Sequence, residues 1–498
     1  MGTVSTAEMR ALEASALAAG WSEKKLMDLA GGSLGKALAS HFPKPGTLVA
    51  YLGKGHNAGD ALIAARLLQI HYGWNVFLRE AHPSHQLAPL TAILRSSYPA
   101  RSLRSAAEIP SPPSRPLVLL DGLLGIGASG PLRPPLRELA REMQFLKSRA
   151  NAFIAAVDLP SGVDPDRGEV FPDSVSADIT FMIGAPKKGL LSSSAINATG
   201  RLALIDIEPL RHSTPTDLEL ICPQQQHFGK SRRPFDFHKG QAGRVSLVAG
   251  SENYPGAAVI AATGALRGGA GLVTLFVPHS IRRMVSQKCP PEIIIRGYHD
   301  PREALELRHD ALVVGCGIGA ISKENEAAWA DLIRHSSQPT VLDADALNFL
   351  AATGQASLIA SHHVLTPHPG EFAKLADELK NHSRETSIRA FTRRCPATLL
   401  LKGSRTLVAN AESPIFVNST GTPAMATGGQ GDLLAGLIGA FLASGKSPLE
   451  AASLGAWLCG RAAEIALKQS DTSEESLTPS DVARFLGAAF NDWKNSAR

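Results

Sequence analysis

The chain has 498 residues, more than a single hydrophobic core usually serves, so we expect two domains. It contains 44% hydrophobic, 19% charged and 5% aromatic residues, a globular composition that excludes a disordered or fibrous chain. The net charge of +5 is spread without a block of consecutive Lys or Arg, and the basic-aromatic clustering of nucleic-acid-binding proteins is missing. We therefore expect no nucleic-acid partner.

The cysteines and the apolar stretches indicate a reducing compartment away from membranes. The five cysteines are far apart and none stands in a CxxC pair, so neither disulfides nor a zinc site are predicted. Residues Met1–Ala19 lack the basic start and apolar run of a secretory signal. The longest apolar stretch, Leu433–Ala443, is about half of the roughly 20 residues that a membrane span needs. We therefore expect a cytoplasmic protein that binds no membrane.

Short runs rich in Val, Ile and Leu alternate with helix-like patterns along the whole chain. The runs show no polar alternation, which predicts strands buried on both faces, and the helices between them predict parallel connections. Each half of the chain is therefore predicted to be α/β, folded as its own three-layer α/β/α domain. The predicted strands are Thr47–Leu52, Val76–Leu78, Leu117–Leu120, Phe153–Val157, Ile179–Ile183, Leu202–Ile205, Val245–Val248, Leu272–Val277, Leu312–Val314, Val341–Leu342, Val364–Leu365 and Thr398–Leu401.

The boundary between the two domains is predicted from a change in composition. From Glu208 to His238 the chain is rich in Pro, Gln and charge and has no sustained hydrophobic period. Such a segment is typical of a linker, part of which can pack on either domain. We therefore place the first domain at residues 1–215 and the second at residues 225–498.

Glycine-rich or acidic loops follow three of the predicted strands of the first half. Ligands of open parallel sheets bind outside the carboxyl ends of the strands, so these loops are candidates for function. A Gly-rich turn before a helix, here predicted over Ala61–Ile70, offers backbone N–H groups to a phosphate. Each Asp alone is more often a helix cap or turn former, but three such loops in one sheet favour a pocket. The loops contain GKGHNAGD (53–60), LLDGLLGIG (119–127) and VDLPSGVD (157–164).

These three loops resemble the signature loops of the NAD(P)H-hydrate epimerase family, and the likeness covers about residues 1–210. The resemblance implies a Rossmann-like fold whose first loop holds the phosphates of the dinucleotide. It also implies a K⁺ ion held by Asn57, Asp121 and Ser161, whose oxygen ligands suit a hard cation. The implied substrate contacts are His56, Asn57, Ala58, Gly59, Asp60, Gly125, Ile126, Gly127, Ala128, Ser129, Gly130, Pro131 and Asp158.

The first loop departs from the pattern of that family. The family usually reads Asn-Asn-Gly-Gly-Asp, where this chain has His56-Asn57-Ala58-Gly59-Asp60. Ala58 adds a methyl group where the backbone approaches the ligand, and His56 replaces an amide. Since Asn57 and Asp60 are kept, we expect the pocket to form, and the departure leaves the rate of epimerisation open.

Two segments of the second half indicate a second pocket. His368 in HPGE (368–371) follows the predicted strand Val364–Leu365 and stands between two prolines, which favours a side chain facing a cleft. TGGQGD (427–432) leads into a predicted helix, Leu433–Leu442, whose start suits a phosphate chain. Asp432 at that start can take a proton from an attacking hydroxyl, although an Asp there can also merely cap the helix.

Two further glycine-rich segments are weaker signals on their own. Pro255-Gly256-Ala257-Ala258 opens a predicted helix that runs to Gly269, and its small residues are equally explained by close packing on a sheet. Gly315-Cys316-Gly317-Ile318-Gly319 follows the predicted strand Leu312–Val314 as another glycine loop.

HPGE, TGGQGD and the segment Lys402–Thr406 together resemble the NAD(P)H-hydrate dehydratases of the ribokinase-like superfamily, over about residues 230–495. The resemblance implies that Asp432 is the catalytic base and that Mg²⁺ accompanies the nucleotide. The implied contacts of ADP or ATP are Lys402, Gly403, Ser404, Arg405, Thr406 and Gly431. The implied contacts of the hydrated dinucleotide are Ala257, Gly317, His368 and Asp432.

The two resemblances imply a bifunctional isomerase and lyase that repairs hydrated NADH and NADPH. The first half would interconvert the R and S hydrates. The second would dehydrate the S hydrate to NAD(P)H, with AMP and phosphate as products when ADP is used. We expect a homo-oligomer. The alternative is a ribokinase-like small-molecule kinase fused to a non-catalytic dinucleotide-binding or scaffold domain, which a stable phosphorylated product would reveal.

Overall fold

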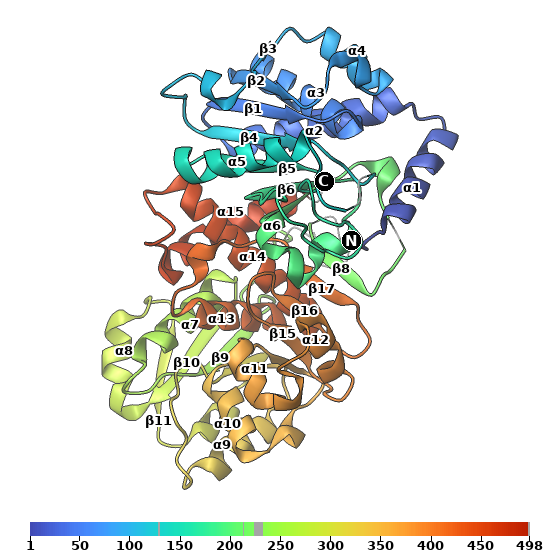
Figure 1. Cartoon of the computed structure of the whole chain (residues 1–498). Coiled ribbons are helices and arrows are strands. Elements are labelled where there is room, and N and C mark those ends of the chain that lie inside the picture. Colours follow the sequence, from blue (N-terminus) through green and yellow to red (C-terminus); the bar gives the residue numbers. More distant parts are fainter. Residues whose placement is uncertain (128–129, 213, 224–232, 497–498) are drawn as a thin grey trace. The chain divides into compact units, whose positions relative to one another are not determined.

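The computed structural model describes residues 1–127, 130–212, 214–223 and 233–496. The chain divides into two compact units, Met1–Leu220 and Ile221–Arg498. Each unit contains one β-sheet with helices packed on it (Figure 1).

The first unit is built on a seven-stranded sheet in which every neighbouring pair of strands is parallel. Its elements are α1 (Thr6–Ala18), α2 (Glu23–His41), β1 (Thr47–Leu52), α3 (His56–Tyr72), β2 (Asn75–Glu80), α4 (Pro89–Ser96), β3 (Arg101–Ser102), β4 (Leu117–Gly122), α5 (Leu136–Ala150), β5 (Phe153–Val157), β6 (Ile179–Ile183), α6 (Ile196–Thr199) and β7 (Arg201–Ile205). The strand order is β3-β2-β1-β4-β5-β6-β7.

Alternate residues of the central strands of this sheet pack into two separate cores. In β1, Leu48 and Ala50 lie in a hydrophobic cluster with α2 and α3. Val49 and Tyr51 lie in a second cluster with α5. Because successive side chains of a strand point to opposite faces, the two clusters place helices on both sides of the sheet. This arrangement confirms the predicted three-layer α/β fold.

The second unit has a longer sheet with an antiparallel end. Its elements are β9 (Arg244–Val248), α7 (Pro255–Arg267), β10 (Leu272–Pro278), α8 (Arg282–Lys288), β11 (Ile294–Tyr298), β12 (Ala311–Val314), α9 (Glu326–His335), β13 (Thr340–Leu342), α10 (Asp345–Thr353), β14 (His363–Leu365), α11 (Pro369–Leu375), α12 (Arg384–Thr392), β15 (Thr398–Leu401), β16 (Leu407–Ala409), β17 (Ile415–Asn418), α13 (Gln430–Ala443), α14 (Pro448–Gln469) and α15 (Pro479–Ser496). The strand order is β11-β10-β9-β12-β13-β14-β15-β16-β17-β8, where β8 (Leu218–Ile221) is the strand on which the division between the units falls.

Three expectations about elements differ from the structure. The pairs β15–β16 and β16–β17 are antiparallel, because short turns rather than helices connect these strands. The predicted linker contains β8, whose Leu218, Leu220 and Ile221 are buried. Helix α3 begins at His56 rather than at Ala61, so the glycine loop before it is shorter than predicted.

Helices α7 and α13 approach each other closely through glycines. A Cβ atom at Gly264 of α7 would lie 2.3 Å from the carbonyl oxygen of Leu433. A Cβ atom at Gly436 of α13 would lie 1.8 Å from the carbonyl oxygen of Ala261. The sequence suggested that the small residues of α7 pack on a sheet, and the structure shows that Gly264 also brings this helix against the start of α13, where Asp432 lies.

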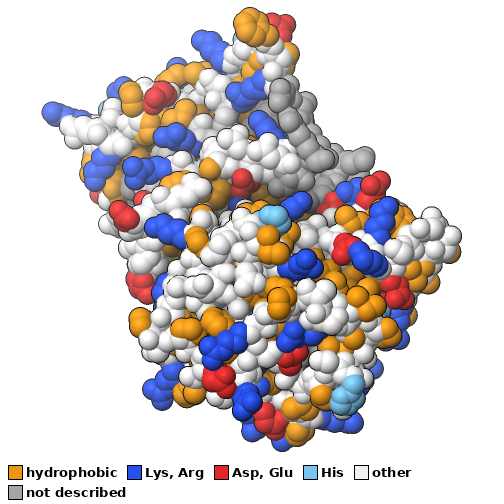
Figure 2. All heavy atoms as spheres, turned by 90° about the horizontal axis from the view of Figure 1, so that it is seen from above, with side chains coloured by type: hydrophobic (Ala, Val, Ile, Leu, Met, Phe, Trp, Pro, Cys, Tyr) orange, Lys and Arg blue, Asp and Glu red, His pale blue; other side chains and the backbone are white. Residues whose placement is uncertain are grey.

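The surface carries charges of both signs. On the face shown in Figure 2, Lys and Arg side chains lie among Asp and Glu side chains instead of gathering into one patch. Among the helices of the described residues, none combines the length and the apolar character that crossing a membrane requires.

We expect Gly436→Ala to destabilise the second unit by about 1–3 kcal/mol, because its new methyl group would overlap the backbone of α7. Gly487→Ala in α15 is the matched control, since a Cβ there meets nothing within 4 Å and alanine favours a helix. Denaturant unfolding monitored by circular dichroism measures both variants. A Gly436→Ala variant as stable as the control would show that the two helices are not in close contact.

Candidate active sites

In the first unit, a chain of hydrogen bonds links the three residues predicted to hold K⁺. The Asn57 side-chain amide donates to the carbonyl oxygen of Leu124 at 2.8 Å. The backbone N–H of Leu124 donates to Ser161 Oγ at 3.1 Å. Ser161 Oγ in turn donates to Asp121 Oδ1 at 2.7 Å. Residues from the ends of β1, β4 and β5 therefore meet around one loop residue.

Asp121 is a buried carboxylate at the centre of this group. Its exposed fraction is 0%, and burial raises its pKa to about 6 although hydrogen bonds from Ser161 and Leu123 lower it. Within the described parts of the chain, no Lys, Arg or His forms an ion pair with it. The group thus offers several oxygen atoms and an uncompensated negative charge.

Asp158, directly after β5, combines a strained backbone conformation with a buried ion pair. Its backbone φ is +66°, a value that non-glycine residues rarely adopt. Lys187 Nζ forms an ion pair with Asp158 Oδ1, and the backbone N–H of Ile183 donates to the same oxygen at 2.9 Å. Lys187 is fully buried, and its ammonium also donates to the carbonyl oxygen of Ile183 at 2.8 Å.

Asp60 and Glu13 are coupled electrostatically to this ion pair. Burial raises the pKa of Asp60 well above its ordinary value, and the charges of Asp158 and Glu13 raise it further, while Lys187 lowers it. Burial and Asp158 likewise raise the pKa of Glu13 in α1. The buried ammonium group of Lys187 therefore pairs with Asp158 and acts electrostatically on Asp60 and Glu13.

The remaining predicted residues of the first site differ in how far they are buried. His56 is exposed at the start of α3, and Ala58 is fully buried within the core formed with α2. The methyl group of Ala58 therefore fills the core instead of facing a ligand, contrary to our expectation for this substitution. The predicted loop Gly125–Pro131 follows β4, and its residues Ala128 and Ser129 lie outside the described residues. Gly59 is buried against Met27 and Thr91.

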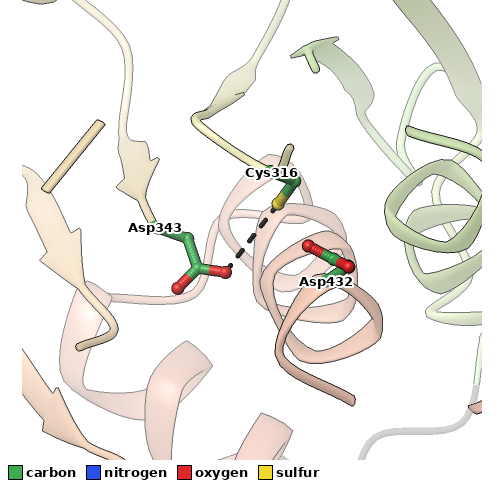
Figure 3. Close-up of side chains that lie close together, drawn as sticks. All are labelled: Cys316, Asp343 and Asp432. Atoms are coloured by element: carbon green, nitrogen blue, oxygen red, sulfur yellow. Dashed lines mark hydrogen bonds between the residues drawn. The ribbon is translucent and has the colours of Figure 1, made fainter. Parts of the chain in front are cut away.

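In the second unit, Cys316, Asp343 and Asp432 bring their side chains together (Figure 3). Their sulfur and carboxylate atoms all lie within 4.8 Å of one another. Cys316 follows β12, Asp343 follows β13, and Asp432 lies in the first turn of α13. The sulfur of Cys316 is 3.8 Å from Asp343 Oδ2.

Residues that follow two further strands contact the carboxylate of Asp343. Thr366, after β14, donates its hydroxyl to Asp343 Oδ1 at 2.8 Å. Lys402, after β15, places Nζ 2.8 Å from the same oxygen and 4.0 Å from Glu371 Oε2. A Cβ atom at Gly431 would lie 3.0 Å from Lys402 Nζ. Two predicted nucleotide contacts, Lys402 and Gly431, are therefore side by side next to Asp432.

The surroundings of Asp432 make its carboxyl group unusually basic. Burial raises its pKa to about 7, and the charge of Asp343 adds to this effect. A hydrogen bond with Cys316 and the charge of Lys402 act in the opposite direction. A carboxyl group with a pKa near neutrality is suited to general acid–base chemistry.

The predicted nucleotide loop Lys402–Thr406 is held by Arg384 of α12. Its guanidinium donates to the backbone carbonyl oxygens of Leu401, Lys402, Ser404 and Arg405 at 2.6–3.3 Å. Within the loop, Arg405 has a φ of +55°, and burial lowers its pKa to about 9. Gly403 has a φ of +135°, a conformation that side chains rarely adopt.

The other predicted substrate residues of the second unit lie in two places. A Cβ atom at Gly317 would lie 2.6 Å from the Cβ atom of Ala257, so these two residues are in contact. His368 caps α11, where its Nδ1 accepts from the backbone N–H groups of Gly370 and Glu371. Its side chain is 57% exposed, so the cap leaves much of the ring open to solvent.

Sequence reasoning missed Asp343 and Lys187. Asp343 directly follows the predicted strand Val341–Leu342, so the rule applied to the strand ends of the first half would have found it. Lys187 lies in Ala185-Pro186-Lys187-Lys188 after the predicted strand Ile179–Ile183. A lysine beside a second lysine suggests a solvated pair, and only the structure shows that Lys187 is buried.

We expect Lys402→Met to destabilise the second unit by about 3–5 kcal/mol, because Asp343 would be left as an unpaired buried carboxylate. The double variant Lys402→Met, Asp343→Asn should recover part of this loss. Lys380→Met is the control, since its partner Asp377 is exposed, and it should change stability by less than about 1 kcal/mol. Denaturant unfolding at neutral pH measures all three, and equal stability of Lys402→Met and the control would rule out a buried ion pair.

Comparison with known proteins supports the predicted family. A family model described as NAD(P)H-hydrate dehydratase matches residues 245–485, and one described as YjeF-related protein N-terminus matches residues 23–189. A ribokinase-like superfamily protein from Enterococcus faecalis V583 matches with a TM-score of 0.50 at 23% identity, over 57% of this chain and 99% of that chain, which shows the fold of the second unit.

Full-length relatives match both units together. The bifunctional NAD(P)H-hydrate repair enzyme of Gloeobacter violaceus is 34% identical over 92% of this chain and 94% of its own length. That of Thermosynechococcus vestitus is 34% identical over 94% of this chain and 93% of its own length. The chain therefore belongs to the family of bifunctional NAD(P)H-hydrate repair enzymes.

Proposed function

We propose that this chain repairs hydrated NADH and NADPH with two separate active sites. The first unit interconverts the R and S hydrates, and the second dehydrates the S hydrate with ADP or ATP. The observation that carries the proposal is the position of Asp432, a carboxyl group with a pKa of about 7 at the start of α13, next to Gly431 and Lys402.

The dehydration requires a base and a place for phosphates. Asp432 takes the proton of the C6 hydroxyl of the hydrate, and the oxygen accepts the terminal phosphoryl group of the nucleotide. The C6–O bond then breaks with its electron pair going to oxygen, and inorganic phosphate leaves. Loss of a proton from C5 to solvent then forms the C5=C6 double bond and restores the dihydronicotinamide ring. ADP would be converted to AMP in this reaction. The charge on the phosphoryl group is met by Lys402 and by the backbone N–H groups that begin α13.

The remaining assignments in the second unit follow from this arrangement. The loop Lys402–Thr406, which Arg384 fixes through its carbonyl oxygens, binds the nucleotide. Ala257 and Gly317, which touch each other, and the open ring of His368 contact the dinucleotide.

We also propose Mg²⁺ as the partner of the nucleotide phosphates in the second unit. Mg²⁺ keeps several waters and binds proteins through one or two carboxylates, with phosphates completing its shell. Glu371 fits this role because its carboxylate is buried near Lys402 and follows the end of β14. When bound, the ion would neutralise charge on the phosphates.

In the first unit, we propose that K⁺ binds between Asn57, Asp121 and Ser161. The donor set consists of oxygen atoms, which suit an alkali cation. The carboxylate of Asp121 is fully buried and has no cationic side chain as partner within the described residues, so a bound cation would offset its charge. The ion would thereby fix the three loops against which the hydrate binds.

We expect 100 mM KCl, compared with 100 mM choline chloride, to raise the unfolding temperature of the first unit by about 3 °C or more at neutral pH. The reason is that K⁺ stabilises the folded state by binding next to ionised Asp121. Differential scanning calorimetry measures the shift. In Asp121→Asn the difference between the two salts should disappear, and a difference that persists in this variant would place the cation elsewhere.

The dehydratase assignment predicts a specific pH dependence. Asp432 acts as a base only when deprotonated, so kcat/KM for the S hydrate should fall as the pH drops below about 7. Asp432→Asn should lower the rate by at least about 100-fold at every pH. The assay follows restoration of dihydronicotinamide absorbance and release of inorganic phosphate with ADP or ATP. A stable phosphorylated product without phosphate release would indicate a kinase instead.

A further inference from the structure

The buried ion pair of the first unit has a geometry that suits acid–base chemistry. Asp158 Oδ1 accepts hydrogen bonds from both Lys187 and the backbone N–H of Ile183. Its other oxygen, Oδ2, has no hydrogen-bond partner within the described residues. One oxygen of the carboxylate is therefore anchored, and the other has no protein partner among the described residues.

Several hydrogen bonds and an ion pair hold Asp158 in place, although its positive backbone φ is unfavourable. The backbone N–H of Asp158 donates to the carbonyl oxygen of Phe181 at 2.9 Å, and the side chain is bound from β6 and from Lys187. Non-glycine residues at positive φ cost of order 1–3 kcal/mol and concentrate at functional sites. A buried lysine is itself costly, so the pair is poor evidence for a purely stabilising role.

Two further carboxyl groups act electrostatically together with the ion pair between Lys187 and Asp158. Asp60 lies in the first turn of α3, and Glu13 lies on α1. The cations that act on this group are Lys187 and, on Glu13 alone, His56 and Arg10. Asp158 and Glu13 act electrostatically on Asp60, and a like charge disfavours the ionised form of a carboxyl group. Asp158 bears the direct ion pair with Lys187, and burial raises the pKa of Asp60, so we assign the proton to Asp60.

We propose that Asp60 and Asp158 are the acid and the base of the epimerisation, and that Lys187 is the positioning residue that holds the carboxylate of Asp158 in place. The inference rests on the proposed function of the first unit and adds roles for residues there. Neighbouring carboxyl groups held in different protonation states commonly divide acid and base roles in this way.

The reaction balances with water alone. Asp60 donates its proton to the C6 hydroxyl, the C6–O bond breaks with its electron pair going to oxygen, and water leaves. The lone pair of the ring nitrogen then forms a C6=N1 double bond, which gives a cationic ring near the carboxylate of Asp158. A water molecule adds to C6 from the opposite face and gives its proton to Asp158 Oδ2. The roles reverse in the opposite direction, and solvent returns the proton to Asp60.

The test uses the full chain with pure R hydrate and no nucleotide, and follows the R to S ratio by chromatography. We expect Asp60→Asn to slow epimerisation by at least about 100-fold. Asp28→Asn, an exposed carboxylate of α2, is the matched control and should keep the wild-type rate. Reaction in H₂¹⁸O should place ¹⁸O at C6 once per inversion.

Lys187 is tested by its effect on the pH profile. Lys187→Met removes the cation that lowers the pKa of Asp60, so the decline of the rate at high pH should move to higher pH, and kcat should fall more than KM rises. Lys187→Arg should restore part of the rate. Dehydration of the S hydrate with ADP and circular dichroism report whether each variant is folded.

The outcomes separate this inference from the proposed function. If the wild-type chain does not epimerise R hydrate at all, the proposed function of the first unit is rejected. If it does, and Asp60→Asn retains a rate within about threefold of wild type, or folded Lys187→Met keeps both rate and pH profile, the inference alone is rejected. A variant that fails to fold is replaced by Asp60→Glu or Lys187→Arg, for which altered pH profiles are expected and an unchanged profile would also reject it.

Discussion

Parallel strands bring their carboxyl ends to one edge of a sheet, and both proposed active sites of this chain depend on that constraint. In the second unit, the ends of β12 to β15 supply Cys316, Asp343, Thr366 and Lys402, which are joined through the carboxylate of Asp343. In the first unit, the ends of β1, β4 and β5 supply Asn57, Asp121 and Ser161. No single loop could assemble either group, because each member comes from a different crossover.

In both proposed sites a lysine ammonium pairs with a buried carboxylate. Lys402 forms an ion pair with Asp343, and the negative charge of Asp343 nevertheless raises the pKa of Asp432. Lys187 neutralises Asp158 in the same way, next to Asp60. Burying such pairs costs free energy that well-packed apolar residues would not. The cost is consistent with selection for chemistry at these positions, since the charges of each pair add to the effect of burial on the pKa of a neighbouring carboxyl group.

Much of the fold could be predicted because its strands are buried on both faces. Runs such as Thr47–Leu52 and Thr398–Leu401 coincide with β1 and β15 in full. Strand β16 was missed because only a short turn, without a helix-like pattern, separates it from β15. Strand β8 was missed because it lies in the segment rich in Pro, Gln and charge that was interpreted as a linker. Strand β11 was missed because four of its five residues are not buried, so it lacks a continuous apolar run, and Arg296 and Gly297 interrupt it.

The sequence motifs indicated individual candidate residues of the two proposed sites, but the contacts that join these residues could not be predicted. The motifs identified Asp432, Asp121 and Asp158, which lie where strand ends and helix starts meet. The burial of Lys187, the anchoring of one oxygen of Asp158 and the loop-holding role of Arg384 depend on contacts between residues far apart in sequence. The methyl group of Ala58 illustrates the same limit, since local sequence suggested a ligand contact and the tertiary structure places it in the core.

The most direct test is whether one preparation of the full chain carries out both epimerisation and dehydration. Pure R hydrate of NADH is supplied with ADP, and dihydronicotinamide absorbance and inorganic phosphate are recorded until the reaction stops. We predict that absorbance returns in full, with one phosphate released per hydrate, because the first unit feeds the second. Untouched R hydrate, in a preparation that dehydrates the S hydrate, would contradict the claim that both units are enzymes.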